Sequence, residues 1–207
     1  MAFERLGGFL GNLGNLVFKG QDTPISEPVR QASDYDEMMN DMMGQYGRTR
    51  EDLEGIMNKI GHHESAGTMD PSIHQYGGGP GRGIYQYETG ANQGGITARN
   101  RLARWFKSKM KDIPEWLSQE NMDTEGFDAS KLTPEQQNML FLADKRYHPT
   151  ASLSAEDTSD LSGWWARNHW AGGNVGTDLY DKKVAAFQDS EESIVNDVVT
   201  EQGAEAY

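Results

Sequence analysis

Apolar positions recur with a helical period between residues 49 and 60. Steps of three and four residues place these side chains on one face of a helix: Leu53, Ile56, Met57 and Ile60. One further turn of that face reaches Glu64, and Gly61 and Gly67 predict that the helix ends nearby. We therefore predict that Glu64 faces the core or a cleft, where burial raises a carboxyl pKa and suits it to general acid catalysis. A solvated Glu64 at a frayed helix end is the alternative.

Capping signals and further apolar periods predict the other helices. A hydroxyl residue followed three positions later by an acid or amide marks three helix starts: Ser33 with Asp36, Thr49 with Asp52, and Thr133 with Gln136. Apolar spacing adds helices over residues 96–110, 161–170 and 177–187, and the helix from Thr133 should end before Pro149. No segment alternates apolar and polar residues convincingly. The predicted class is therefore all-α, with about five or six helices and room for a short hairpin near residues 76–88.

Several predicted helices carry large side chains whose burial can be anticipated. Methionines at four-residue spacing are expected to pack in the core: Met38, Met39, Met42 and Met43. One stripe of the helix over residues 96–110 is expected to be buried: Leu102, Phe106 and Met110. Three tryptophans either belong to the core or stack on sugar rings: Trp164, Trp165 and Trp170. Trp170 is the stronger sugar candidate, because it lies at a turn.

Composition and charge exclude several classes of function. The chain has 207 residues, of which 36% are hydrophobic, enough for one core with appendages. Its net charge of −13 argues against nucleic acid as a partner. There is no cysteine, and no apolar run is long enough to span a membrane as a helix. The histidines lack metal-ligand spacing, so the sequence predicts no metal site and no cofactor.

A cluster of positive charge interrupts this acidic chain. No acid lies between Thr89 and Lys111, whereas the same stretch holds six cations: Arg99, Arg101, Arg104, Lys107, Lys109 and Lys111. Two interpretations stand open. The cluster is either a solvated helix face or a surface that attracts an anionic polymer, which bacterial cell walls supply.

Two short motifs flank the glycine-rich loop of residues 77–81. Glu64-Ser65 ends the first predicted helix, and Gly83-Ile84-Tyr85-Gln86 follows the loop. In these residues the chain resembles the lysozyme-like soluble lytic transglycosylases, which carry Glu-Ser at a helix end and a Gly-Leu-Met-Gln type motif further on. A third family motif, a Tyr-Asn-Ala-Gly turn, is matched loosely by the turn at His169-Trp170, where the Tyr-Asn pair is replaced. The resemblance covers residues 49–174.

The resemblance implies a lysozyme-like helical domain that cleaves the β-1,4 bond between N-acetylmuramic acid and N-acetylglucosamine in peptidoglycan. It implies that Glu64 protonates the leaving oxygen and then acts as a base on the 6-hydroxyl, which closes a 1,6-anhydro ring. The substrate's N-acetyl group would stabilise the oxocarbenium ion between these steps. The residues implied in substrate binding are Ser65, Gly83, Ile84, Tyr85, Gln86, His169 and Trp170.

A second carboxylate would change the predicted reaction. Hydrolytic glycosidases usually use two carboxyl groups, one on each side of the scissile bond. Asp70 and Glu88 are the candidates for the second group. If either lies across a cleft from Glu64, hydrolysis by a lysozyme mechanism becomes the better prediction.

The layout suggests three parts and a setting. Residues 1–32 form an apolar arm and linker, residues 33–175 the lytic domain, and residues 176–207 a C-terminal helix and acidic tail. The arm either docks on its own domain or stays disordered, or it docks on a partner chain or a membrane surface. With no recognisable export signal, we expect a bacteriophage virion protein of the tail or internal core. It would contact other virion proteins through residues 1–20 and through the C-terminal tail. The alternatives are a structural virion protein that binds glycan without cutting it, and a released endolysin.

Overall fold

The computed structural model describes residues 33–90, 94–118, 126–170 and 175–204, with side chains as far as residue 192. This part of the chain is mainly helical, which confirms the all-α class. The arm and linker predicted for residues 1–32 lie outside the described residues. Among the described helices, none combines the length and the apolar character needed to cross a membrane.

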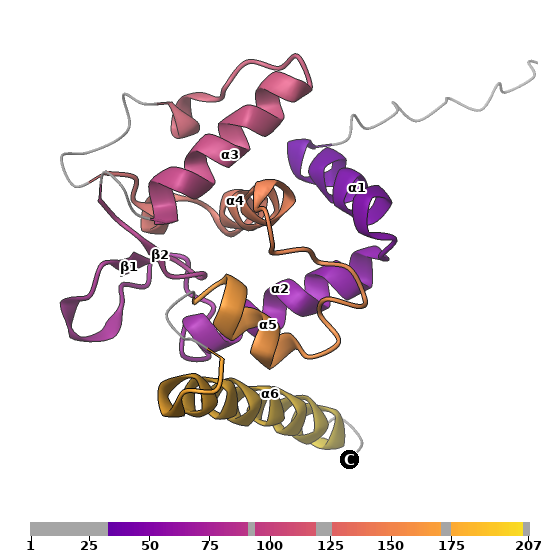
Figure 1. The fold of residues 1–207 in the computed structure, drawn as a ribbon, viewed down its shortest axis with the longest axis vertical. Coiled ribbons are helices and arrows are strands. Elements are labelled where there is room, and N and C mark those ends of the chain that lie inside the picture. Colours follow the sequence, from indigo (N-terminus) through magenta and orange to yellow (C-terminus); the bar gives the residue numbers. More distant parts are fainter. Residues whose placement is uncertain (1–32, 91–93, 119–125, 171–174, 205–207) are drawn as a thin grey trace, which may run out of the picture. The chain divides into compact units, whose positions relative to one another are not determined.

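Six α-helices and one small hairpin make up the described fold (Figure 1). The helices are α1 (Asp34–Tyr46), α2 (Arg50–Glu64), α3 (Gly94–Ser108), α4 (Pro134–Tyr147), α5 (Leu161–Asn168) and α6 (Asp178–Ala204). The hairpin pairs β1 (Gly81–Arg82) with β2 (Tyr87–Glu88) in antiparallel register, with Gly81 opposite Glu88. The hairpin allowed for near residues 76–88 is therefore present, although it is short.

The capping signals locate the starts of α1, α2 and α4 correctly. Thr49 and Asp52 form a reciprocal capping box, in which each side chain accepts a hydrogen bond from the other residue's backbone N–H. Thr133 and Gln136 form the same box at the start of α4, which ends two residues before Pro149. These boxes fix where α2 and α4 begin, and both helices carry residues of the cavity described below.

The core surrounds α4, which packs against α1 and α3 and lies near the centre of Figure 1. Four consecutive α4 residues are fully buried: Leu140, Phe141, Leu142 and Ala143. Three of the four α1 methionines are buried too, which confirms their predicted core role: Met38, Met39 and Met42. Because α4 is buried on so many sides, it has no strongly amphipathic pattern. Its position in the chain and its capping residues were therefore the better guide to this helix.

Two expectations about helix ends were wrong. Met110 was expected on the buried stripe with Leu102 and Phe106, but its side chain is 96% exposed. The reason is that α3 ends at Ser108 and Met110 takes a left-handed backbone conformation with φ +56°. At the other end of the chain, α6 continues to Ala204, well past residue 187. No glycine or proline interrupts residues 178–202, so no backbone signal stops the helix there.

Most of the positive cluster is engaged within the fold. Lys109 lies 2.8 Å from the Asp41 carboxylate, and Lys111 contacts Asp34 at 2.7 Å, so both join the end of α3 to α1. Arg101 pairs with Asp144 of α4. The cluster therefore acts largely as an internal connection between helices, a third outcome beside the two interpretations offered from sequence.

Candidate functional site

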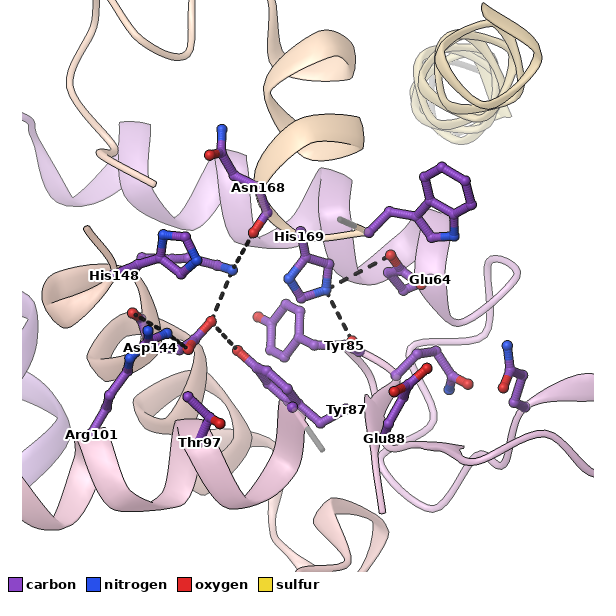
Figure 2. Close-up of a pocket in the computed structure, with 15 residues that line it drawn as sticks. Glu64, Tyr85, Tyr87, Glu88, Thr97, Arg101, Asp144, His148, Asn168 and His169 are labelled. Carbon is purple, nitrogen blue, oxygen red and sulfur yellow. Dashed lines mark hydrogen bonds and ion pairs between the residues drawn. The ribbon is translucent and has the colours of Figure 1, made fainter. Parts of the chain in front are cut away.

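A cavity of about 570 Å³ opens where the end of α2 meets the hairpin, the start of α3 and the ends of α4 and α5 (Figure 2). Glu64, the last residue of α2, lies on its wall with its side chain only 15% exposed. This confirms that the apolar stripe of α2 delivers Glu64 to a cleft. The remaining lining comes from Gln75, from residues 85–88 of the hairpin, from Gly94, Thr97 and Arg101 of α3, and from residues around the ends of α4 and α5: Asp144, Lys145, His148, Asn168, His169 and Trp170.

The Glu64 carboxyl group is held by an indole. Trp165 Nε1 donates a hydrogen bond of 2.6 Å to Glu64 Oε1. Burial raises the pKa of Glu64 to about 7, and this effect outweighs the opposing influence of the Trp165 hydrogen bond and of the more distant Lys183 and Lys145. Burial therefore keeps a fraction of the Glu64 carboxyl groups protonated near neutral pH. A carboxyl group in that state can both donate and accept a proton.

His169 lies beside the same oxygen as a neutral ring. Its Nε2 is 3.7 Å from Glu64 Oε1 and 3.0 Å from the Tyr85 carbonyl oxygen. Because a carbonyl only accepts, the ring proton is assigned to Nε2. Burial, followed by the charge of Lys145, lowers the pKa of His169 to about 3. His169 therefore adds no positive charge near Glu64, and instead joins the turn after α5 to the hairpin.

A buried amide fixes the turn of Gly83-Ile84-Tyr85-Gln86. Gln137 of α4 accepts a hydrogen bond from the Ile84 backbone N–H at 2.6 Å through Oε1. Its Nε2 donates to the carbonyl oxygens of Pro71 and Leu132 at 2.8 and 3.0 Å. Gly83 has φ +74°, and a Cβ there would lie 2.4 Å from Gln137 Oε1. Glycine is thus required both by the conformation and by the approach of the amide.

A second glycine lets the hairpin reach α2. A Cβ on Gly61 would lie 2.7 Å from Ile84 Cγ2, so the bare backbone of the last α2 turn is what accommodates Ile84. Tyr85 then stacks on Phe141 of α4, with ring centroids 4.6 Å apart. These contacts set the distance between the hairpin and Glu64.

Gln137→Met tests the importance of this clamp. The replacement fills the same volume but leaves the Ile84 N–H and two carbonyl groups without their partner. We expect a loss of roughly 3 kcal/mol in the free energy of unfolding, because each buried unpaired polar group costs about 1–3 kcal/mol. Urea denaturation, monitored by circular dichroism, measures this loss. Glu135→Gln, on the exposed first turn of the same helix, serves as the control, and a Gln137→Met loss as small as the control's would contradict the clamp.

The wall behind Trp165 is completed by α6. Phe187 of α6 is fully buried, and its ring lies 5.2 Å from that of Trp165. His63 meets the same indole edge-on at 4.5 Å, and its Nδ1 lies 2.9 Å from Ser190 Oγ of α6. Burial lowers the pKa of His63 to about 4, so this ring is neutral as well. The C-terminal helix thus supports the indole that holds Glu64.

The chain was compared with family models, with characterised proteins and with solved structures. None of the three comparisons found a match. The resemblance to lytic transglycosylases therefore rests on the motif residues, and the chemistry of the cavity carries the functional proposal.

The sequence-predicted site residues divide into those that line the cavity and those that support it. Five of the predicted binding or acid residues line it with Glu64: Tyr85, Gln86, Glu88, His169 and Trp170. Ser65 lies in the turn after α2, where its buried Oγ accepts a hydrogen bond from the Met69 N–H at 2.9 Å. Ser65, Gly83 and Ile84 are therefore structural supports here, because none of them reaches the cavity surface.

The two candidates for a second carboxylate differ in position. Asp70 is exposed, lies outside the cavity lining, and accepts hydrogen bonds from the backbone and hydroxyl of Ser72. Glu88 lines the cavity but carries an exposed side chain on β2. Asp70 is therefore placed to shape a loop, and Glu88 is the candidate that shares the cavity with Glu64.

Several cavity residues were missed by sequence reasoning. Asp144 and Lys145 lie inside a run of buried α4 residues, with 8% and 2% exposed side chains and 2.9 Å between Lys145 Nζ and Asp144 Oδ2. Burial alone would raise the pKa of Asp144, but Lys145 and Arg101 together lower it to about 2. The available signal was an acid–base pair within an otherwise apolar stretch, since buried charges are kept where they have partners.

Proposed function

We propose that this chain cleaves the β-1,4 bond between N-acetylmuramic acid and N-acetylglucosamine in peptidoglycan as a lytic transglycosylase, with Glu64 as both acid and base. The observation that carries the proposal is the state of Glu64. It is an enclosed carboxyl group with a pKa of about 7 on the wall of a cavity whose volume suits sugar rings. A lysozyme-type general acid needs the same environment, a carboxyl group kept partly protonated by burial.

Glu64 performs two proton transfers in the proposed reaction. Its protonated form gives a proton to the glycosidic oxygen as the bond from C1 to that oxygen breaks. The resulting carboxylate then takes the proton of the muramic acid 6-hydroxyl as O6 bonds to C1, which forms the 1,6-anhydro ring and restores the acid. Trp165 donates to Oε1 in both states, which favours Oε2 as the oxygen that carries the proton. No water enters the products.

The other cavity residues suit the binding of a sugar. Trp170 and Gln86 line the same space as Glu64, Trp170 with a half-buried side chain and Gln86 with its Nε2 bonded to the Gly83 carbonyl oxygen at 2.8 Å. Flat aromatic walls pack against the apolar faces of sugar rings, so Trp170 is the residue suited to stacking. Glu88 supports a second candidate function, hydrolysis, because it is a further carboxylate lining the cavity.

The proposal is tested first by release of dye from labelled, purified peptidoglycan. The full chain is expected to release soluble dye at neutral pH in proportion to enzyme and time, whereas heat-denatured chain releases none. Sedimentation with the same peptidoglycan measures binding separately. Binding without release would contradict the enzymatic proposal and favour a structural protein that holds glycan without cutting it.

We also propose that the chain acts from a phage particle, held by residues 1–20 and with the C-terminal tail as a second contact. Eight large apolar side chains fall in the first eighteen positions, and burial of each contributes about 1.5–3 kcal/mol. Removal of residues 1–20 should therefore spare dye release but abolish co-purification with the particle. Normal incorporation of the truncated chain would show that the segment is no anchor, and loss of solubility would show that it belongs to the domain's own core.

A further inference from the structure

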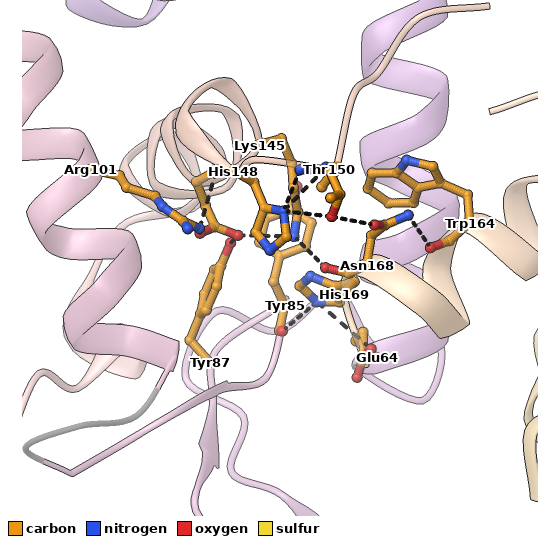
Figure 3. A network of polar contacts seen from close by, with 12 residues as sticks. Glu64, Tyr85, Tyr87, Arg101, Lys145, His148, Thr150, Trp164, Asn168 and His169 are labelled. Atoms are coloured by element: carbon orange, nitrogen blue, oxygen red, sulfur yellow. Dashed lines mark hydrogen bonds and ion pairs between the residues drawn. The ribbon is translucent and has the colours of Figure 1, made fainter. Parts of the chain in front are cut away.

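The end of the cavity away from Glu64 holds two cations that share one carboxylate (Figure 3). Lys145 Nζ lies 2.9 Å from Asp144 Oδ2, and Arg101 Nη1 donates to Asp144 Oδ1 from the side of α3. All three residues line the cavity. Lys145 is almost completely buried, and Arg101 retains 20% exposure of its side chain.

The charges in this group do not balance. Two full positive charges face one negative charge, and enclosed charges are favourable only when they are paired. Of the other acids in the described lining, Glu64 contacts Trp165 and lies beside His169, while Glu88 extends from the opposite hairpin and is exposed (Figure 2). Lys145 Nζ also donates to the Asn168 carbonyl oxygen at 3.4 Å, so the excess positive charge that an anionic group of a ligand would pair with is chiefly that of the partly exposed Arg101.

A neutral donor stands beside the two cations. The Nδ1 atom of His148 accepts hydrogen bonds from the backbone N–H groups of Thr150 and Ala151 at 3.2 and 3.1 Å. The ring proton is therefore assigned to Nε2. Burial, followed by the charges of Lys145 and Arg101, lowers the pKa of His148. His148 also lines the cavity, so its Nε2–H is a second kind of donor for an anion.

We propose that this end of the cavity binds a carboxylate carried by the substrate, with Arg101 and Lys145 supplying the charge and His148 a hydrogen bond. The identity of that carboxylate rests on the proposed function. In peptidoglycan it belongs either to the lactyl group of muramic acid or, where that group is joined to a peptide, to the peptide stem. The site would then distinguish muramic acid strands from neutral N-acetylglucosamine polymers.

Three small sugars test the site on the full chain by nuclear magnetic resonance titration. N-acetylmuramic acid carries the lactyl carboxylate, N-acetylglucosamine lacks it, and N-acetylmuramoyl dipeptide carries its carboxylate on the stem. We expect an acidic sugar to bind roughly tenfold more tightly than the neutral one, as a charge-assisted hydrogen bond allows. It should also shift the ring resonances of His148. Whichever acidic sugar shows the preference identifies the source of the carboxylate.

Arg101→Gln removes the excess charge while leaving Asp144 paired with Lys145, and Arg101→Lys keeps the charge as the matched control. The preference for acidic over neutral sugars should disappear in Arg101→Gln and largely remain in Arg101→Lys. Equal binding of acidic and neutral sugars by the natural chain, absence of binding by either acidic sugar, or a preference that survives Arg101→Gln overturns the proposal. If Arg101→Gln does not fold, weakening of the preference by salt in the natural chain decides, because screening acts on charge pairs.

These binding measurements do not depend on cleavage. A charge preference in a chain that releases no wall fragments would contradict the proposed function and leave the anion site standing. Cleavage of peptidoglycan without a preference for acidic sugars would contradict the anion site and leave the proposed function standing. The two proposals can therefore fail separately.

Discussion

Glu64→Gln is expected to abolish the release of peptidoglycan fragments while the chain stays folded. The amide keeps the shape of the side chain and can still accept the Trp165 hydrogen bond at Oε1, but it cannot donate a proton to a leaving oxygen. General acid–base catalysis contributes about 10²–10⁴ in rate, so a loss of roughly a thousandfold is expected. Dye release from labelled peptidoglycan measures it. Glu51→Gln, on the exposed first turn of the same helix, should retain full activity. Near-natural activity in Glu64→Gln would exclude Glu64 as the acid.

The same variant should be more stable than the natural chain at alkaline pH. The pKa of Glu64 is about 7 in the folded chain against an ordinary value of 4.5, so the folded state favours the protonated form. The natural chain therefore loses stability from this group as pH rises through that window, and the charged carboxylate is most costly above pH 7. Glu64→Gln lacks this cost. We expect a gain of about 2–3 kcal/mol at pH 8 and almost none at pH 4, measured by urea unfolding. If the free energies of unfolding of the two chains changed in parallel with pH, the pKa of Glu64 would have its ordinary value.

Asp144→Asn is expected to cause the largest loss of stability. It leaves Lys145 buried, and Arg101 beside it, without the carboxylate that both contact. Removal of one partner of a buried ion pair costs about 3–5 kcal/mol, because the remaining charge has lost its compensation. Urea unfolding at pH 7 measures the loss.

Two comparisons separate this effect from simple disturbance of α4. The exposed Asp70→Asn should cost less than about 1 kcal/mol. Combining Asp144→Asn with Lys145→Met removes the uncompensated buried cation and should recover part of the loss.

The low pKa of Asp144, about 2, adds a dependence on pH. The stabilisation by this carboxylate is present above its ordinary pKa of 3.8 and disappears as pH falls toward 2. A cost near that of Asp70→Asn, or no recovery in the double variant, would contradict the charge cluster.

Features set by neighbouring residues were predictable from sequence. The capping boxes of α2 and α4 involve residues three apart, and the stripe leading to Glu64 follows one helical period, so local geometry determines both. The burial of Glu64 follows from this stripe. The end of α3 is the instructive exception, because the apolar period continued to Met110 although the backbone turned two residues earlier.

Features that depend on distant contacts were not predictable. Trp165 and Glu64 are 101 positions apart, and Gln137 and Ile84 are 53 apart. No local pattern marks either hydrogen bond, since each depends on how α4 and α5 pack against the hairpin and α2. The motif of residues 83–86 did indicate a special turn, but only the packing shows that Gly83 and Ile84 receive the Gln137 amide.

In the proposed reaction one carboxyl group, Glu64, breaks the glycan strand without water. The most direct test is mass spectrometry of the sugar ends released from purified peptidoglycan by the full chain. The proposed reaction predicts muramic acid ends in the 1,6-anhydro form, which lack the mass of one water, and this pattern should persist in Glu88→Gln. Release of mainly reducing muramic acid ends, abolished by Glu88→Gln, would contradict the transglycosylase reaction and establish hydrolysis by two carboxylates.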